Sequence, residues 1–327
     1  MNSFTVHLED QEQHLVRQIA QELPTIDVGS LDDDALLTTI ALASKRIPER
    51  LARTLIMFRK NSNDYGTLLF RNLPIDEMLP STPADGRICR CKTTSISESS
   101  LALLMMWLGE PIGYLDEKEG ALIQNVCPVQ GQENRQENTG SVYLEFHTED
   151  GFHPFKPDFV GLLCLKSDHH HVARTGTASI RKILAHLDEE TIAWLRKPLY
   201  HIRLASSFTK DLTTVKYSSV LPILSGNDGE PELCMDGHAM EATIPEAQHA
   251  MDTLEAALKA ALFEVVLLPG DLLIVDNRVA AHTRTAFQPQ YDGNDRWLQR
   301  MFVVQDFRRS HISRPAGSHV CLPLMVE

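Results

Sequence analysis

The sequence of 327 residues contains no CxxC pair, no internal repeat and no apolar run long enough to cross a bilayer. Cys89 and Cys91 stand two apart, a spacing that suits neither a disulfide nor a usual zinc knuckle, so we expect reduced thiols. The longest apolar run, residues 101–108, falls short of the ~20 residues of a membrane span. The polar, acidic N-terminal residues do not resemble a signal peptide. We therefore expect a cytoplasmic protein.

Basic residues are fewer than acidic ones: 31 Lys and Arg against 44 Asp and Glu give a net charge of −13. An acidic surface repels a phosphate backbone, so we expect no nucleic-acid partner. The same charge favours a cationic small substrate, but only weakly, because salt screens surface charges within about 10 Å. A composition with 43% hydrophobic and 23% charged residues is typical of a globular domain.

Apolar periodicity predicts a helical layer in residues 1–64 and a β-rich core in residues 65–305, followed by a C-terminal tail at 306–327, all in one domain. Within the first part, residues 8–23 and 31–58 have helical spacing. Further helices are predicted over 97–108, capped by Ser97, and over 244–261. Short apolar segments bounded by turns predict strands at 66–73, 142–147, 159–165, 175–180, 200–204, 232–235, 263–268, 271–275 and 297–304.

Many short strands favour a sandwich or jelly roll. The polar residues 115–142 precede the most informative segment of the chain, and long polar loops in compact domains are commonly functional. We interpret this stretch as a lid over the site.

One imidazole and one carboxylate stand at the predicted end of a strand, in His147-Thr-Glu149. Side chains alternate along a strand, so His147 and Glu149 share a face and are able to share a metal ion; the alternative is a polar strand rim. His282 follows a turn, an apolar strand and a second turn, and offers a third ligand. Two histidines and one carboxylate with open positions form the facial triad of non-haem Fe(II) oxygenases. The HExxH helix of zinc hydrolases is absent.

Two arginines follow on the strand after His282. Arg296 and Arg300 share one strand face with residue 298, so both are able to point into the cavity that holds the metal. The planar guanidinium group pairs with a carboxylate through two hydrogen bonds, which suits a 2-oxoglutarate cosubstrate. The alternative for each is an exposed strand arginine.

These segments together resemble the clavaminate synthase-like 2-oxoglutarate oxygenases, a family that includes asparagine oxygenase and the hydroxylases of free arginine and lysine. The resemblance covers roughly residues 65–305 and rests on His147-Thr-Glu, on Phe152-His-Pro-Phe-Lys-Pro, and on the run from Pro269-Gly-Asp to Arg300. It implies a mainly β fold with flanking helices around a double-stranded β-helix (jelly roll) core. It also implies Fe(II), 2-oxoglutarate and O₂ as cofactor and cosubstrates.

The resemblance further implies roles for single residues. The facial triad holds Fe(II). Arg296 binds the 5-carboxylate of 2-oxoglutarate, assisted by a threonine on the strand after Lys166-Ser-Asp; Thr175 has the best spacing, and Thr177 is the alternative.

The substrate side follows by the same resemblance. Arg300 clamps the α-carboxylate of an amino acid, Gln124 lies near its α-amino group, and Asp236 reads its side chain. Glu117 and Asn138 fall in the predicted lid.

His238, two residues after Asp236, departs from the pattern of the arginine hydroxylases. These enzymes tend to show two acids spaced by one residue, whereas this chain has Asp236-Gly-His238. A single acid still neutralises a lysine ammonium, which is a compact point charge. Asp236 is equally able to cap a turn, and Gln124 is equally an ordinary strand residue.

Three further segments have structural interpretations. The tract Asp168-His-His-His171 is a solvated loop rather than a metal site. His153 has a structural or supporting role near the metal strand, and Met105-Met-Trp107 belongs to the core.

The sequence therefore predicts a hydroxylase of a free L-amino acid at a β- or γ-carbon, with L-lysine ahead of L-arginine. The alternative within the class is asparagine or another neutral polar amino acid, free or tethered to a carrier protein. A non-catalytic jelly-roll metal-binding protein is the alternative from a different class, and Arg296 argues against it. The family suggests a role in bacterial secondary metabolism, and the oligomeric state stays open.

Overall fold

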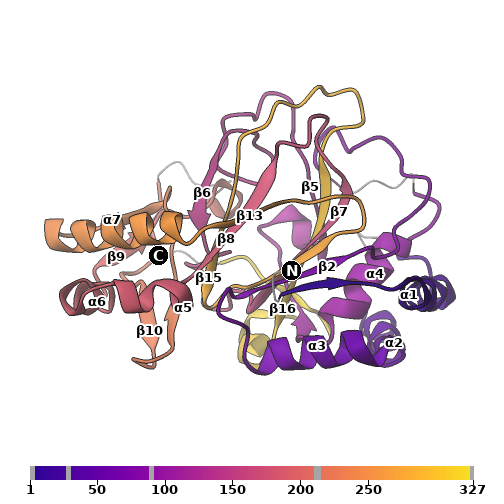
Figure 1. The fold of residues 1–327 in the computed structure, drawn as a ribbon, viewed down its shortest axis with the longest axis horizontal. Helices are drawn as coiled ribbons and strands as arrows, with labels where there is room; N and C mark the ends of the chain where they lie inside the picture. Colours follow the sequence, from indigo (N-terminus) through magenta and orange to yellow (C-terminus); the bar gives the residue numbers. More distant parts are fainter. Residues whose placement is uncertain (1–3, 27–30, 88–91, 210–214, 325–327) are drawn as a thin grey trace.

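The computed structural model describes residues 4–26, 31–87, 92–209 and 215–324, and arranges them as two β-sheets with helices on both outer sides (Figure 1). Cys89 and Cys91 lie outside the described residues. Four cysteines inside them carry free thiols, as expected: Cys127, Cys164, Cys234 and Cys321. Among the described helices, none combines the length and apolar character needed to cross a membrane.

The core consists of a large and a small sheet. In the large sheet the strands lie in the order β1 (Thr5–His7), β2 (Thr67–Arg71), β14 (Leu272–Asp276), β7 (Phe159–Lys166), β16 (Trp297–Val304) and β3 (Glu110–Pro111), and β5 (Ile123–Val126) also pairs with β16. In the small sheet the order is β13 (Phe263–Val266), β8 (Arg174–Ser179), β15 (Ala280–Arg284) and β6 (Leu144–His147). The chain alternates between the sheets from β6 to β8 and from β13 to β16.

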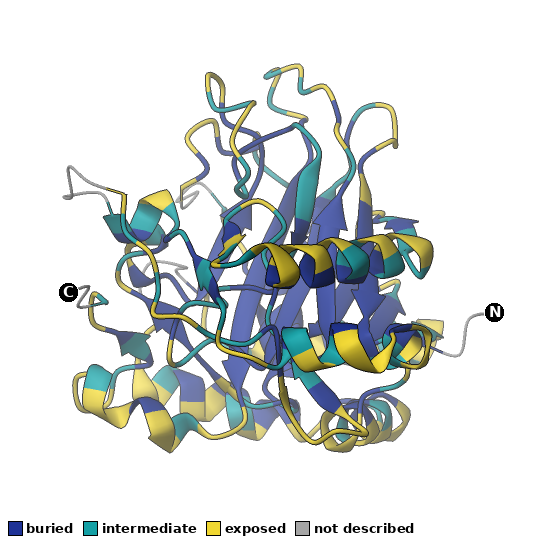
Figure 2. Cartoon of the chain, turned by 90° about the vertical axis from the view of Figure 1, so that its left-hand side faces the viewer, coloured by how far each residue is buried: buried dark blue, intermediate teal, exposed yellow. Residues whose placement is uncertain are grey.

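Each sheet has its own helical layer, as Figures 1 and 2 show. The large sheet is covered by α1 (Asp10–Glu22), α2 (Asp34–Ser44), α3 (Glu49–Lys60) and α4 (Ile96–Met105). The small sheet is covered by α5 (Ile180–Ile183), α6 (Glu189–Leu195) and α7 (Pro245–Ala260). Short elements complete the described chain: β4 (Gly113–Tyr114), η2 (Lys118–Gly120), η3 (Leu184–His186), β9 (Tyr200–Ile202), η4 (Ser206–Thr209), β10 (Leu224–Gly226), β11 (Pro231–Leu233), β12 (Met240–Ala242), η5 (Phe307–Ser313) and β17 (Val320–Cys321).

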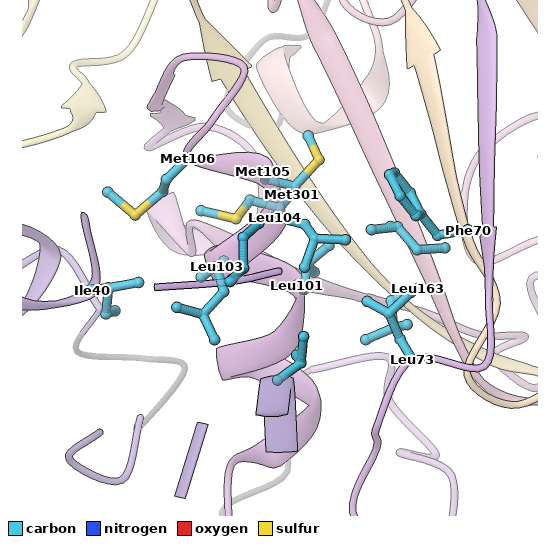
Figure 3. Packing of buried hydrophobic residues seen from close by; sticks show 14 of the residues in the cluster. Ile40, Phe70, Leu73, Leu101, Leu103, Leu104, Met105, Met106, Leu163 and Met301 are labelled. Atoms are coloured by element: carbon cyan, nitrogen blue, oxygen red, sulfur yellow. The ribbon is translucent and has the colours of Figure 1, made fainter. Parts of the chain in front are cut away.

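Helix α4 is the innermost helix and packs directly on the large sheet. All of its residues are buried. A side chain at Gly161 of β7 would lie only 2.5 Å from the Met105 sulfur, so the glycine is what lets the helix approach. Figure 3 shows Met105 beside Met301 of the sheet, and Leu163 and Phe70 belong to the same buried cluster. The interpretation of Met105 as a core residue is therefore confirmed.

The cap of α4 differs from the prediction. Ser97 lies inside the first turn, and the Asp76 carboxylate instead accepts hydrogen bonds from the backbone N–H groups of Ile96 (3.1 Å) and Ser97 (3.0 Å). A carboxylate at a helix N-terminus satisfies the free N–H groups and favours the helix dipole. This residue is twenty positions away in sequence, so local pattern could not identify it.

The two sheets face each other through alternate residues of their strands. On β7, Phe159, Leu163 and Leu165 face the helices, whereas Val160 and Leu162 face the small sheet. The Thr67 hydroxyl donates to the Thr177 hydroxyl across the sheets at 2.9 Å. Apolar side chains fill one part of the space between the sheets, and the candidate site lies in the other.

The predicted β-rich core with flanking helices is confirmed, with three differences in detail. Strand β1 of the N-terminal region joins the large sheet, so this region is not helical throughout. Strand β5 lies within the predicted lid and is held by β16, because its four residues are all buried and paired. In the C-terminal tail, β17 pairs with β4.

Candidate active site

A cavity of about 530 Å³ opens between the sheets. Ten of the eleven residues predicted for the site line it: Glu117, Gln124, Asn138, His147, Glu149, Thr175, Asp236, His282, Arg296 and Arg300. Thr177 is the exception, because its side chain is buried beside Thr67 at the sheet interface. The structure thus favours Thr175 over Thr177.

The three predicted metal ligands converge although they come from two strands and a loop. His282 on β15 pairs with His147 on β6, and the two rings lie 4.1 Å apart. Glu149 follows β6, and its Oε2 lies 3.3 Å from His282 Nε2. One donor atom from each of the three residues lies within 4.8 Å of the others. His147 Nδ1 is 2.9 Å from the Glu145 carbonyl oxygen, which leaves Nε2 for a metal.

The protonation of this group suits metal binding, which requires deprotonated ligands. Burial and the nearby His147 lower the pKa of His282 to about 4, so its ring is neutral at pH 7. Burial acts to raise the pKa of Glu149, but the Arg300 charge and the hydrogen bond from His282 outweigh it, and the net pKa lies well below its ordinary value. Two imidazoles and one carboxylate fit Fe(II), with positions left open for other ligands.

Asn277 holds the loop that carries Glu149, a role that the sequence analysis missed. Its Oδ1 accepts from the Glu149 N–H at 2.7 Å, and its Nδ2 donates to the carbonyls of Glu149 (3.0 Å) and Pro157 (2.9 Å). Asn277 is fully buried. Its position in the turn between β14 and β15 was the available signal, because a buried asparagine there must satisfy its amide with neighbouring backbone.

Arg300 stands at the metal end of the cavity among acids. It forms ion pairs with Glu117 and Glu149, and its Nε donates to Gln124 Oε1 at 3.2 Å. Burial raises the pKa of Glu117, which the charge of Arg300 only partly offsets. Burial and the charges of Glu117 and Glu149 also raise the pKa of Asp150. Arg300 and Gln124, which were assigned by resemblance to the two groups of an amino-acid head, thus contact each other.

Arg296 and Arg284 lie at the other end of the cavity. Arg296 Nη2 donates to the Thr175 hydroxyl at 3.1 Å. Arg284 shares β15 with His282, and its guanidinium group donates to the carbonyls of Gly140 (2.9 Å) and Val142. Neither arginine forms an ion pair with a carboxylate of the described residues, and burial lowers the pKa of both. Two buried cations without an anion fit a ligand that carries a carboxylate at this end.

Asp236 lies in the cavity wall, where its backbone forms an isolated antiparallel β-bridge with that of His147. Its Oδ1 accepts from the N–H groups of His238 (3.0 Å) and Ala239 (2.7 Å), so it also caps the turn. The His238 side chain is exposed and contacts Arg203 at 3.0 Å. The second acid of the arginine-hydroxylase pattern is therefore replaced by a residue that does not line the cavity.

His153 and Asp168, which the sequence analysis did not assign to the metal, are held by local contacts. His153 is buried against Tyr114, with ring centroids 4.4 Å apart, and its Nδ1 accepts from the Phe155 N–H at 3.0 Å. The Asp168 carboxylate accepts from three backbone N–H groups of its own loop. His169 on that loop lies 3.1 Å from Asp292, and with Asp295 these residues form a second group, outside the cavity, whose donor atoms are close enough to share a metal ion. The prediction that this tract is not a metal site therefore stays a prediction.

The fold and this site define the class of protein. Residues 96–302 match the family described as "Taurine catabolism dioxygenase TauD, TfdA family", and the chain belongs to this family. The predicted resemblance to the clavaminate synthase-like oxygenases is confirmed: clavaminate synthase 2 of Streptomyces clavuligerus is 33% identical over 88% of this chain and 88% of its own. The chain is thus an enzyme of the oxygenase class.

Two further relatives are named for reactions on amino acids. L-asparagine oxygenase of Streptomyces coelicolor is 40% identical over 97% of this chain and 94% of its own. L-lysine 3-hydroxylase of Catenulispora acidiphila is 35% identical over 85% of this chain and 78% of its own. The solved structure of an asparagine oxygenase in complex with Fe(II), 2S,3S-3-hydroxyasparagine and succinate has a TM-score of 0.92 at 39% identity, over 98% of this chain and 100% of the other.

Proposed function

We propose that the protein is an Fe(II)- and 2-oxoglutarate-dependent oxygenase with a jelly-roll core that hydroxylates free L-asparagine at C3. The observation that carries the choice of substrate is the cavity wall at Asp236, where His238 points away instead of supplying a second acid. The 40% identity with an asparagine oxygenase supports the same choice. Asparagine, the alternative in the sequence analysis, thus replaces lysine as the first candidate.

Asp236 suits a carboxamide. A carboxylate accepts a hydrogen bond from an amide NH₂ group, and this requires no full charge on the substrate. A guanidinium or ammonium group buried at this position would demand stronger compensation than one acid that already caps a turn. The Asp236 wall is next to His147, so a short side chain suffices to reach from the metal to this carboxylate.

The amino-acid head group fits the cluster around Arg300. The guanidinium group binds the α-carboxylate, while Glu117 and Gln124 Oε1 accept from the α-ammonium group. Asn138 lines the same cavity and completes the enclosure. This arrangement fixes the Cα end and the amide end of asparagine, so that one face of C3 is presented to the metal.

The cosubstrate fits the end with two arginines. Arg296 and the Thr175 hydroxyl bind the distal carboxylate of 2-oxoglutarate, which supplies the missing anion. With Fe(II) held by His147, Glu149 and His282, O₂ and 2-oxoglutarate supply the oxidising chemistry and yield succinate and CO₂. A structure of a related non-heme iron oxygenase in complex with Fe and alpha-ketoglutaric acid, at 30% identity and a TM-score of 0.84 over 97% of this chain and 99% of the other, supports this assignment. A cytoplasmic location and the lid over 115–142 stay predictions.

Succinate release from 2-oxoglutarate, measured with Fe(II), ascorbate and each of twenty amino acids, tests the proposal. We expect turnover with L-asparagine above all others, and a product that mass and NMR analysis identify as 3-hydroxyasparagine. Selective turnover of lysine or arginine would contradict the substrate, and absence of turnover with every free amino acid would favour a tethered one.

The substitution Asp236→Asn tests the proposed recognition directly. Asn Oδ1 is still able to cap the turn, but the new NH₂ group donates where the carboxylate accepted. We expect the ratio of kcat/KM for asparagine to kcat/KM for aspartate to fall about 10- to 100-fold. This is the effect of one charge-assisted hydrogen bond. The matched control His238→Asn lies two residues away, outside the cavity, and leaves the ratio unchanged.

A further inference from the structure

Arg284 is a buried charge to which the proposed function assigns no direct contact with a ligand. It lies two residues after His282 on β15, lines the cavity, and is 5% exposed. Both terminal nitrogens donate to backbone carbonyls, those of Gly140 and Val142. Its Nε is buried without a hydrogen-bond partner in the described chain. A charged guanidinium group thus donates hydrogen bonds to two carbonyls, although a neutral donor would be able to form the same hydrogen bonds.

The two carbonyls belong to residues 133–142, called the closing segment below. This segment carries Asn138 into the cavity wall and leads directly into β6 with His147. It is also tied to the loop after β15, because the Phe287 N–H donates to the Ser141 carbonyl at 3.0 Å and the Tyr291 hydroxyl donates to Glu133 Oε1 at 2.6 Å. The two stretches run beside each other above the sheets in Figure 1.

That loop connects Arg284 to Arg296. Both guanidinium carbons lie near the ring of Phe287, at 5.1 Å and 5.9 Å from its centroid. Both arginines are buried, line the same cavity and form no ion pair within the described chain, so the two positive charges repel each other. An anion at Arg296 offsets this repulsion and favours the position in which Arg284 donates to the carbonyls of Gly140 and Val142.

We propose that Arg284 is a positioning residue that couples binding of a carboxylate at Arg296 to the placement of the closing segment. The inference rests on the proposed function, because the carboxylate is the distal one of 2-oxoglutarate. It predicts that a carboxylate bound at Arg296 fixes residues 133–142 and thereby the part of the cavity wall that includes Asn138.

Hydrogen exchange of the closing segment tests the coupling without any turnover. The protein is loaded with Fe(II) under exclusion of O₂, and amide exchange is followed with and without saturating 2-oxoglutarate, whose affinity is titrated separately. In the unaltered protein we expect 2-oxoglutarate to slow exchange in residues 133–142 by at least about tenfold, the effect of two hydrogen bonds from a charged donor.

Two variants separate the charge from the hydrogen bonds. Arg284→Met loses both the charge and the hydrogen bonds. We therefore expect 2-oxoglutarate to bind more weakly, and a saturating concentration of 2-oxoglutarate no longer slows exchange in the closing segment. Arg284→Lys keeps the charge but is unable to hold both carbonyls, so affinity stays close to normal while the protection falls. Arg174→Met is the matched control, since Arg174 lies on the neighbouring strand with its side chain 58% exposed, and it changes neither quantity.

The outcomes distinguish the two proposals. Failure of the unaltered protein to bind 2-oxoglutarate contradicts the proposed function. Normal binding together with an unchanged response in Arg284→Lys overturns the coupling alone, even if Arg284→Met does not fold. Normal binding with no effect of 2-oxoglutarate on the closing segment overturns it as well.

Discussion

The two ends of the cavity balance their charges in opposite ways. At the metal end, Arg300 stands among the acids Glu117, Glu149 and Asp150 and forms ion pairs with the first two. At the cosubstrate end, Arg284 and Arg296 form no ion pair within the described chain, and the Asp168 charge only partly offsets the effect of burial on Arg296. The first end is neutralised mainly by its own residues, whereas the second leaves positive charge for a ligand.

This difference explains how one small cavity selects two different molecules. Uncompensated cations attract an anion strongly because burial excludes the water that would otherwise solvate them. The mixed cluster at the metal end offers both a donor for a carboxylate and acceptors for an ammonium group, which is the pattern of an amino acid. The predictions below test this contrast, beginning with the largest expected effect.

The substitution His282→Ala removes a ligand at the metal end. We expect turnover to fall to background and metal affinity to fall by more than the ~10–100-fold that follows loss of a hydrogen bond behind a ligand. Metal titration and succinate release measure the two effects. His311→Ala, at an exposed histidine, is the control; unchanged metal affinity in His282→Ala would reject the triad.

The pair Arg300→Met and Arg296→Met separates the two ends most directly. Removing Arg300 leaves buried acids unpaired, so we expect the free energy of unfolding of the metal-free protein to fall by about 3–5 kcal/mol. Removing Arg296 deletes an unpaired buried cation, so stability stays equal or rises. Urea denaturation measures both.

The same pair also separates the ligands. Added 2-oxoglutarate should still stabilise Arg300→Met against urea but should no longer stabilise Arg296→Met. Equal losses of stability in both variants would show that the two ends do not differ in charge balance.

Asn277→Ser weakens the support of Glu149 without touching the ligand set. We expect metal affinity to fall about 10–100-fold, because the loop that carries the carboxylate loses its amide contacts. Binding of 2-oxoglutarate through Arg296 should change less. Asn294→Ser, at an exposed asparagine, is the control; metal affinity equal to that of the control would contradict the role.

The last prediction concerns pH. Burial lowers the pKa of His153 to about 4 from an ordinary value of 6.5, so between these values the unfolded chain binds more protons than the folded one. The free energy of unfolding therefore falls as the pH drops from 6.5 to 4, by up to about 1.4 kcal/mol per pH unit for this group. His153→Asn should reduce that slope in urea titrations at several pH values. An unchanged slope would show that His153 titrates normally.

Several features follow from sequence pattern because they depend on local geometry. Alternation along strands places His147 with Glu149 and Arg296 with Arg300, and all four line the cavity as predicted. The same rule was also a signal for Arg284, two residues after His282. Apolar periodicity located the principal helices and most strands of both sheets.

Other features depend on which distant residues meet. Asp76 rather than Ser97 caps α4, and Asn277 accepts a hydrogen bond from the Glu149 N–H. The Thr177 hydroxyl accepts a hydrogen bond from Thr67 and does not line the cavity. The sequence offered Gln124 as a strand residue, but it did not show that β5 is fully buried, because this burial comes from pairing with β16.

The sequence by itself determined the chemical inventory: two histidines, a carboxylate and two arginines at spacings that place them on common strand faces. Only the tertiary structure decided three contacts: Glu117 forms an ion pair with Arg300, the charge of Arg296 acts on Arg284, and His238 contacts Arg203 outside the cavity. The physical reason is that periodicity fixes the direction of a side chain relative to its own strand, whereas charge balance depends on groups brought together from different strands and loops.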